Sequence, residues 1–149
     1  MSPHSRYDWQ QRIKSVELDY QLAVRAGQFY LDAIRREPFL IPKNFKVRDV
    51  QSMIDRIEGT YLIRLFAAFE AGLRTYWATL RETVPPSRDL IDGVSALRRM
   101  NASVRESVHE VRRFRNALVH DADDYDDPIS VTVARRQLQV FFSHLPDDW

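Results

Sequence analysis

The sequence predicts an all-α protein that folds as a single helical bundle, and three observations support this class. The chain of 149 residues has only four glycines and is rich in helix-forming residue types. It has no short runs in which apolar and polar residues alternate, as they would in half-buried strands. Apolar residues recur instead at steps of three and four, and a hydrophobic fraction of 44% suffices for one core over residues 1–149.

Two long helices are expected in the first half of the chain. The first spans about residues 8–36 and ends before Pro38, and the second spans about residues 47–83 and ends before Pro85. The second has an apolar stripe made of Leu62, Phe66, Phe69, Leu73, Tyr76, Trp77 and Leu80. The first has a narrow seam, which serves either the internal core or contacts between protomers: Trp9, Ile13, Val16, Tyr20, Ala23, Gly27, Tyr30 and Ile34.

Shorter helices are expected in the second half. A short helix capped by Ser87 should reach about residue 99. Ser103 and Glu106 have the spacing of a capping box, which predicts the start of a fourth helix that continues through Leu118. An aspartate-rich loop follows, and a last helix should span about residues 130–144. Two long antiparallel helices with two to three shorter ones make the predicted bundle.

Composition and motif spacing exclude several functional classes. There is no cysteine, so neither disulfides nor zinc–thiolate sites can form. We expect a cytoplasmic protein without membrane association, because no run of 18 apolar residues exists and the first residues lack an apolar signal core. We expect no metal and no other cofactor, since no pair at metal-ligand spacing exists among His4, His109, His120 and His144.

The basic residues are unevenly chosen and unevenly placed. The net charge of +1 argues against general nucleic-acid binding, but 19 of the 22 basic residues are arginine, which binds phosphates with two donors. Six of these arginines lie between Arg98 and Arg115. An acidic cluster follows, which would repel RNA and is more simply a solvated loop: Asp121, Asp123, Asp124, Asp126 and Asp127.

Two charged residues occupy apolar stripes. At 100° per residue, Glu70 lies about 40° from Phe66 within the stripe of the second long helix, and Arg115 lies within that of the fourth. Burying either charge alone would be costly, so each needs a partner. We expect Glu70 to pair with Arg115 across the two helices and so to orient it. The alternative is a pair between Glu70 and Arg74, one turn away.

The opposite face of the fourth helix is predicted to be a polar strip. Within about 100° of arc it carries Arg105, His109, Arg112, Arg113, Asn116 and His120. These residue types suit phosphodiester cleavage without a metal, because a histidine can transfer the proton while arginines stabilise charge on phosphorus. Arg112, Arg113 and His109 are the candidate substrate-binding residues. The alternative is an ordinary solvated face with incidental histidines.

Two segments resemble one known family. The segment RNALVH, residues 115–120, has an arginine, a polar residue, three more residues and a histidine, and it resembles the signature of HEPN (higher eukaryotes and prokaryotes nucleotide-binding) domains. The segment LFAAFEAGLRTYW, residues 65–77, is also similar to that class, including its acid within the apolar stripe. The order of the helices extends the resemblance to nearly the whole chain and implies a HEPN-like bundle.

The resemblance implies a metal-independent endoribonuclease, often a toxin or an anti-phage or stress effector. Arg115 and His120 would be the essential catalytic pair, with Asn116 in support. Members typically dimerise so that two copies of the motif line one cleft. The implied products carry a 2′,3′-cyclic phosphate and a 5′-hydroxyl.

The spacing of the motif adds a constraint. On a regular helix, Arg115 and His120 point about 140° apart. Either the helix ends near Val119 or a partner protomer completes the site, and we favour the dimer. In HEPN toxins paired with a nucleotidyltransferase antitoxin, a tyrosine follows the histidine by two residues; here Ala122 is at that position, and the nearest tyrosine is Tyr125. This departure argues against that type of antitoxin. The partners that the resemblance implies are RNA, a second protomer, and an antitoxin or other defence-system protein.

Two other functions remain open. The first is a catalytically inactive HEPN module that scaffolds a complex or binds a nucleotide, with Arg115 serving the core. The second is a plain helical interaction protein in which the arginine and the histidine match the motif by chance.

Overall fold

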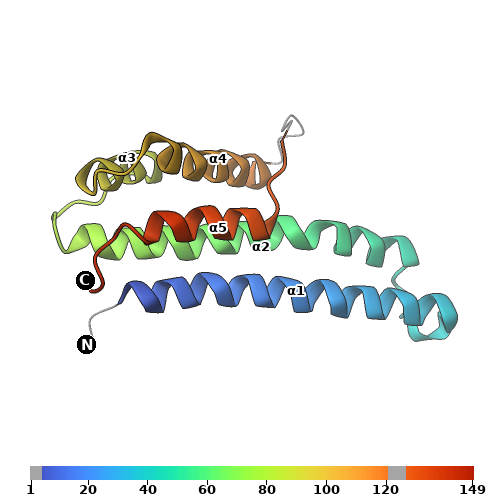
Figure 1. Ribbon diagram of the computed structural model, residues 1–149. Helices are drawn as coiled ribbons and strands as arrows, with labels where there is room; N and C mark the ends of the chain where they lie inside the picture. Colours follow the sequence, from blue (N-terminus) through green and yellow to red (C-terminus); the bar gives the residue numbers. More distant parts are fainter. Residues whose placement is uncertain (1–4, 121–126) are drawn as a thin grey trace.

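The computed structural model describes residues 5–120 and 127–149, which form a bundle of five α-helices (Figure 1). The elements are α1 (Arg6–Arg36), the short 3-10 helix η1 (Pro38–Leu40), α2 (Val47–Ala78), α3 (Ser87–Leu97), α4 (Ala102–Val119) and α5 (Val131–Phe142). The predicted all-α helical bundle is therefore confirmed. The one β pairing in the described residues is an isolated bridge between Ser5 and Asp148. Among the same residues, no helix combines the length and the apolar character that a transmembrane span requires.

The helices pack in three layers (Figure 1). α2 and α5 form the middle layer; α1 packs on one side of it, and the pair α3 and α4 packs on the other. The antiparallel hairpin of α1 and α2 extends beyond the shorter helices, and a second small core of Leu31, Ile34 and Val50 stabilises that extension. Long amphipathic helices can project in this way because each buries its apolar stripe against the other.

Aromatic residues of α2 and α5 form the centre of the main core. The centroid of the Phe69 ring lies 5.4 Å from that of the Phe141 ring and 5.1 Å from that of the Phe142 ring. Both pairs meet edge to face, which is a favourable geometry for aromatic rings. Gly72 makes this approach possible. A Cβ at that position would lie 2.7 Å from Phe142 Cζ and 3.1 Å from Trp9 Cδ2, so any side chain would push the helices apart.

The seam of α1 faces the internal core, which leaves it unavailable for contacts between protomers. Trp9, Ile13 and Ile34 are buried as predicted. Tyr30 is 36% exposed, however, and Leu31 is buried in its place. The reason is that an α-helix has 3.6 rather than 3.5 residues per turn, so a straight stripe drifts by one residue over several heptads.

The predicted capping box of α4 is wrong. The cap is Asn101, whose side-chain oxygen accepts the backbone N–H of Ser103 at 3.0 Å. The Ser103 hydroxyl donates to that same oxygen at 3.2 Å, and the Glu106 carboxylate pairs with Arg113 at 2.5 Å. Neither side chain is therefore directed at the free amides that a capping box would satisfy.

Two other helix ends differ from the prediction. α2 ends at Ala78 rather than at about residue 83, and the Trp77 indole N–H donates to the Thr83 carbonyl at 3.0 Å, which holds the chain in a turn after the helix. α3 ends at Leu97, two residues early, because Arg99 adopts the left-handed conformation with φ of 52°. The backbone therefore turns at Arg99, between the end of α3 and the start of α4.

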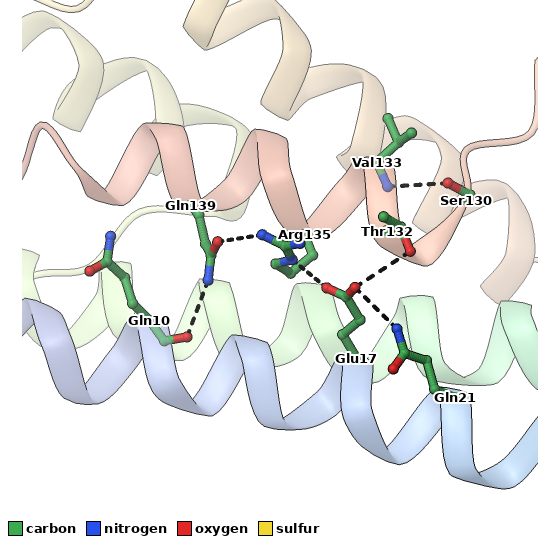
Figure 2. Close-up of polar contacts among 8 residues, drawn as sticks. All are labelled: Gln10, Glu17, Gln21, Ser130, Thr132, Val133, Arg135 and Gln139. Atoms are coloured by element: carbon green, nitrogen blue, oxygen red, sulfur yellow. Dashed lines mark hydrogen bonds and ion pairs between the residues drawn. The ribbon is translucent and has the colours of Figure 1, made fainter.

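A polar network that no pattern in the sequence predicts connects α1 to α5 (Figure 2). Glu17, 8% exposed, forms an ion pair with Arg135 and accepts a hydrogen bond from the Thr132 hydroxyl at 3.5 Å. Arg135 also donates to Gln139 at 2.8 Å, and the Gln139 amide donates to the Gln10 carbonyl at 3.4 Å. The network therefore satisfies a nearly buried carboxylate between two helices, which an apolar stripe alone could not do.

Candidate functional site

Glu70 and Arg115 meet where α2 packs against α4. A terminal nitrogen of the Arg115 guanidinium lies 3.4 Å from Glu70 Oε2, and Arg74 Nε donates to Glu70 Oε1 at 3.0 Å. Glu70 therefore pairs with both of the arginines that the sequence offered as its partner, Arg115 and Arg74. The side chains of Glu70 and Arg115 are 23% and 24% exposed, so the pair lies at the edge of the core and not within it.

Ser87 is a third partner of Glu70, and this role corrects its prediction as a helix cap. Ser87 is the first residue of α3, it follows Pro86 at the cap position, and its hydroxyl donates to Glu70 Oε2. Three helices therefore converge on one carboxylate. No sequence signal marks this contact, because Glu70 and Ser87 are 17 residues apart on different helices.

The Arg115 guanidinium is also held by an aromatic ring. Its central carbon lies 4.6 Å from the centroid of the Phe66 ring, a cation–π distance. Its Nε is buried and has no hydrogen-bond partner. Beside it is a pocket of about 230 Å³ whose lining includes Arg115, Glu70, Arg74 and Ala67. The orientation of Arg115 is therefore set by α2.

The electrostatic balance at Glu70 favours its charged form. Partial burial by itself would raise the pKa of the carboxyl group, but hydrogen bonds from Ser87 and Arg74 and the charges of Arg74 and Arg115 outweigh it, so the pKa lies below the ordinary value of 4.5. Glu70 is therefore ionised at neutral pH and serves as a fixed counter-charge.

Arginines crowd around the middle of α4. Burial and then the positive charges of Arg113, Arg88 and Arg115 lower the pKa of the Arg112 guanidinium, which stays protonated, whereas Asp92 acts in the opposite direction. Arg88 comes from the first turn of α3, directly after Ser87. The helical pattern of the fourth helix predicts Arg112 and Arg113 at this place, whereas Arg88 belongs to α3 and follows from no such pattern. A cluster of guanidinium groups of this kind favours an anionic ligand such as a phosphate.

His109 is not on the exposed strip where the helical wheel placed it. It is 7% exposed, because α3 covers it, and its Nε2 lies 2.7 Å from Asp92 Oδ1 of that helix. Its Nδ1 accepts a hydrogen bond from Arg112 Nε at 3.2 Å. The ring thus touches a neighbouring helix and an arginine, and its predicted contact with substrate stays untested.

Arg113 and Asn116 lie on either side of that cluster. Arg113 is exposed and pairs with Glu106 at 2.5 Å. Asn116 is half-buried, and its carbonyl accepts the backbone N–H of His120 at 3.0 Å. The amide side chain of Asn116 is therefore close to the end of the helix, one turn before His120.

His120 is the exposed residue that closes α4. The helix ends at Val119, and His120 has φ of −93° and ψ of 8°, outside regular helical values. One of the two geometries considered from the sequence, a helix that ends near Val119, is thus present. Within this chain, Arg115 is directed at α2 while His120 lies at the end of α4. Residues 121–126, which hold all of the acidic cluster except Asp127 as well as Ala122 and Tyr125, lie outside the described residues.

In the described residues, the chain is therefore a five-helix bundle with a cluster of arginines on α3 and α4, and Arg115 of this cluster pairs with Glu70 of α2. The chain matches no protein-family model, no curated protein and no solved structure in the comparisons made with it. In residues 5–120 and 127–149, no group of three or more histidine, aspartate or glutamate side chains could hold a metal ion. The polar groups that the described part of the site offers are its arginines, Asn116 and His120.

Proposed function

We propose that this protein is a metal-independent endoribonuclease of the HEPN type that acts as a homodimer, with Arg115 and His120 in a cleft between protomers. The observation that carries the proposal is the contact between Glu70 and Arg115 across α2 and α4. It supports the proposal because Glu70, the acid within the apolar stripe, and Arg115, the arginine of the motif, are in direct contact although they lie 45 residues apart in the sequence.

The proposed chemistry follows from the residue types. His120 takes the proton from a ribose 2′-hydroxyl or donates one to the leaving 5′-oxygen, and Arg115 stabilises the charge that develops on phosphorus. Arg112 and Arg113 bind neighbouring phosphates, and Asn116 donates a hydrogen bond to the scissile group. The bond between phosphorus and the 5′-oxygen breaks while the 2′-oxygen bonds to phosphorus, which leaves a 2′,3′-cyclic phosphate and a 5′-hydroxyl.

We propose a dimer because His120, at the end of α4, and the guanidinium of Arg115 face different surroundings within one chain. His120 is exposed at the end of the helix, whereas the Arg115 guanidinium is held against Phe66 and Glu70 of its own chain. A second protomer related by a two-fold axis could bring its own His120 to the first protomer's Arg115. We propose that the protein acts in the cytoplasm as a toxin or an anti-phage effector. An antitoxin or another defence-system protein would control its activity.

The direct test is cleavage of a structured RNA by the purified protein in the presence of EDTA. We expect cleavage with 5′-hydroxyl products, and we expect His120→Ala to reduce the rate by about 100-fold or more. His144→Ala, on the last turn after α5, is the matched control and should leave the rate unchanged. Equal rates for wild type and His120→Ala, or loss of activity in EDTA, would refute the proposal.

A mixing experiment tests the shared cleft. Arg115→Ala and His120→Ala are each expected to be inactive alone. If one cleft combines the arginine of one protomer with the histidine of the other, random mixing should restore about a quarter of wild-type activity, since half of the dimers are mixed and half of their sites are complete. No recovery would show that each protomer carries both groups.

A second candidate function is a catalytically inactive HEPN module that binds a nucleotide or another protein. Two observations favour it: the Arg115 guanidinium is already occupied by Glu70 and Phe66, and α1 exposes Leu18, Leu22 and Phe29 on the face opposite its core seam. Clean wild-type protein that fails to cleave RNA, yet binds a nucleotide or a partner, would support this candidate.

A further inference from the structure

His109 lies in a chain of three polar side chains that links α3 to the arginine cluster. Asp92 Oδ1 is 2.7 Å from His109 Nε2, and Arg112 Nε donates to His109 Nδ1 at 3.2 Å. The imidazole is nearly buried, whereas the Asp92 side chain is 46% exposed. The histidine therefore has a different partner on each ring nitrogen, one from a neighbouring helix and one from its own.

These partners assign the protonation of the ring. An arginine Nε can only donate, so His109 Nδ1 must carry a lone pair. The hydrogen is then on Nε2, where it is donated to the Asp92 carboxylate. A neutral imidazole with this one tautomer satisfies all three groups, and the opposite tautomer would place N–H against N–H at Arg112.

Arg112 needs such a restraint. Its guanidinium is drawn into a region that already holds Arg88, Arg113 and Arg115, whose charges repel it. A long side chain under like-charge repulsion would otherwise turn away into solvent, and ordering it only on binding would cost conformational entropy. The bond from Nε to His109 leaves the terminal nitrogens of the guanidinium available to another ligand.

We propose that Asp92 and His109 are positioning residues that hold Arg112 ready to bind a phosphate of the RNA backbone. The inference rests on the proposed ribonuclease function, because it names the group that this arginine binds. His109 then acts through Arg112, and it does not touch the substrate itself. This role replaces the direct substrate contact that the sequence predicted for His109.

The first test needs no RNA. In ¹⁵N-labelled protein, NMR should show His109 with a protonated Nε2 and an unprotonated Nδ1, and the Nε–H of Arg112 should exchange slowly with solvent. His109→Gln can reach Asp92 but not Arg112, and it should restore fast exchange at Arg112. A protonated Nδ1 in the wild type, or unchanged Arg112 exchange in His109→Gln, would overturn the proposal.

The second test measures the affinity for a 2′-O-methyl RNA oligonucleotide, which cannot be cleaved. We expect His109→Gln to weaken binding by about tenfold, and His109→Asn, whose side-chain oxygen can replace Nδ1 as acceptor for Arg112, to stay within about threefold of wild type. Asp92→Ala changes a half-exposed residue and should keep the fold, so it serves as the second variant. We expect it to weaken binding more than His109→Asn and less than His109→Gln. Wild-type affinity in both His109→Gln and Asp92→Ala would overturn the proposal.

A double-mutant cycle separates positioning from general stability. In an Arg112→Ala background, His109→Gln should have no further effect on affinity, because the residue through which it acts is gone. An equal loss of affinity in the wild-type and Arg112→Ala backgrounds would overturn the proposal that His109 acts through Arg112. If the wild type binds no RNA at all, the proposed ribonuclease function fails with it, and the NMR test alone then decides whether the three residues form the chain described.

Discussion

At the scale of single residues, the geometry of the proposed site depends most on Glu70. Its carboxylate pairs with Arg74 at 3.0 Å and with Arg115 at 3.4 Å, and it accepts a hydrogen bond from the hydroxyl of Ser87. These three partners come from three different helices. A hydrogen bond to a charged group contributes more than a neutral one, and a half-buried charge without its partner is costly. Glu70 therefore couples the stability of the bundle to the orientation of Arg115.

Replacing Glu70 by glutamine should lower the free energy of unfolding by about 1–3 kcal/mol, because the amide leaves Arg115 half-buried without a counter-charge. Urea unfolding at pH 7 measures this loss. The matched control is Asp55→Asn on the same helix, and it should change stability by less than about 0.5 kcal/mol. The Asp55 side chain is exposed and accepts a hydrogen bond from Gln51 at 3.0 Å. Equal losses in the two variants would contradict the role assigned to Glu70.

The lowered pKa of Glu70 also predicts a pH dependence. A carboxyl group whose pKa is lower in the folded state than in the unfolded state contributes stability above its ordinary value of 4.5, and loses it as the pH falls through the folded value. The difference in stability between wild type and Glu70→Gln should therefore be complete at pH 7 and shrink below pH 4.5. A difference that is constant down to pH 3 would exclude this linkage.

Glu70 and Arg115 could be found from the sequence because each interrupts an apolar stripe. A charge in such a position needs a partner, and only a few residues are candidates. Ser87 and Arg88 could not be found in this way, because neither interrupts a pattern. They join the site because the loop between α2 and α3 returns the chain to Glu70, and the helical periodicity does not encode that path.

At the scale of single elements, α4 carries most of the proposed site, and its start is set by Asn101. An asparagine at this position accepts one of the backbone amides that the first turn leaves free. Ser103 and Glu106 matched the spacing of a capping box, but the helix begins two residues earlier than that pattern requires. Asparagine and serine are both good caps, so the local sequence offered two starting points.

The assignment of the cap can be tested with two alanine variants. Asn101→Ala should reduce stability by about 1 kcal/mol, since a backbone amide of the first turn loses its acceptor. Ser103→Ala removes only an exposed hydroxyl and should cost less than about 0.5 kcal/mol. Thermal unfolding of both proteins measures the comparison. A larger cost for Ser103→Ala would instead support the capping box at that residue.

The exposed face of α4 was predicted only in part. Periodicity places His109, Arg112 and Asn116 on one side of the helix, and this phase is correct for the helix alone. Which part of that side meets solvent depends on α3, because α3 packs over His109 and supplies Asp92. A helical wheel contains no information about neighbouring helices, so the burial of His109 could not be predicted.

At the scale of the whole molecule, α5 is held against α1 by the network around Glu17 (Figure 2). Glu17→Gln should lower the free energy of unfolding by about 2–4 kcal/mol, because Arg135 then keeps a partly buried charge without its partner. Asp19→Asn is the matched control: it is nearby on α1, 48% exposed, and contacts Arg64 at 3.6 Å. We expect its effect to be below about 1 kcal/mol in the same denaturant titration.

Two glycines of α2 test the packing of the layers. Gly72→Ala should destabilise the protein by about 1–3 kcal/mol, since the new methyl group would overlap Phe142 and Trp9 of the neighbouring helices. At Gly59 the nearest atom is Leu118 Cδ2 at 3.3 Å, the end of a flexible side chain, so the gain in helix propensity should offset the contact. Comparable melting temperatures for the two variants would contradict the close approach at Gly72.

The sequence by itself determined the helical class, the two long helices and the two charged residues inside apolar stripes. These features follow from periodicity and from the cost of burying a charge, and both act along one helix. The tertiary structure decided which groups meet: Ser87 with Glu70, His109 with Asp92, and Glu17 with Arg135. Such pairs depend on how loops return the chain and on how each helix is rotated against its neighbours, and no local pattern records either.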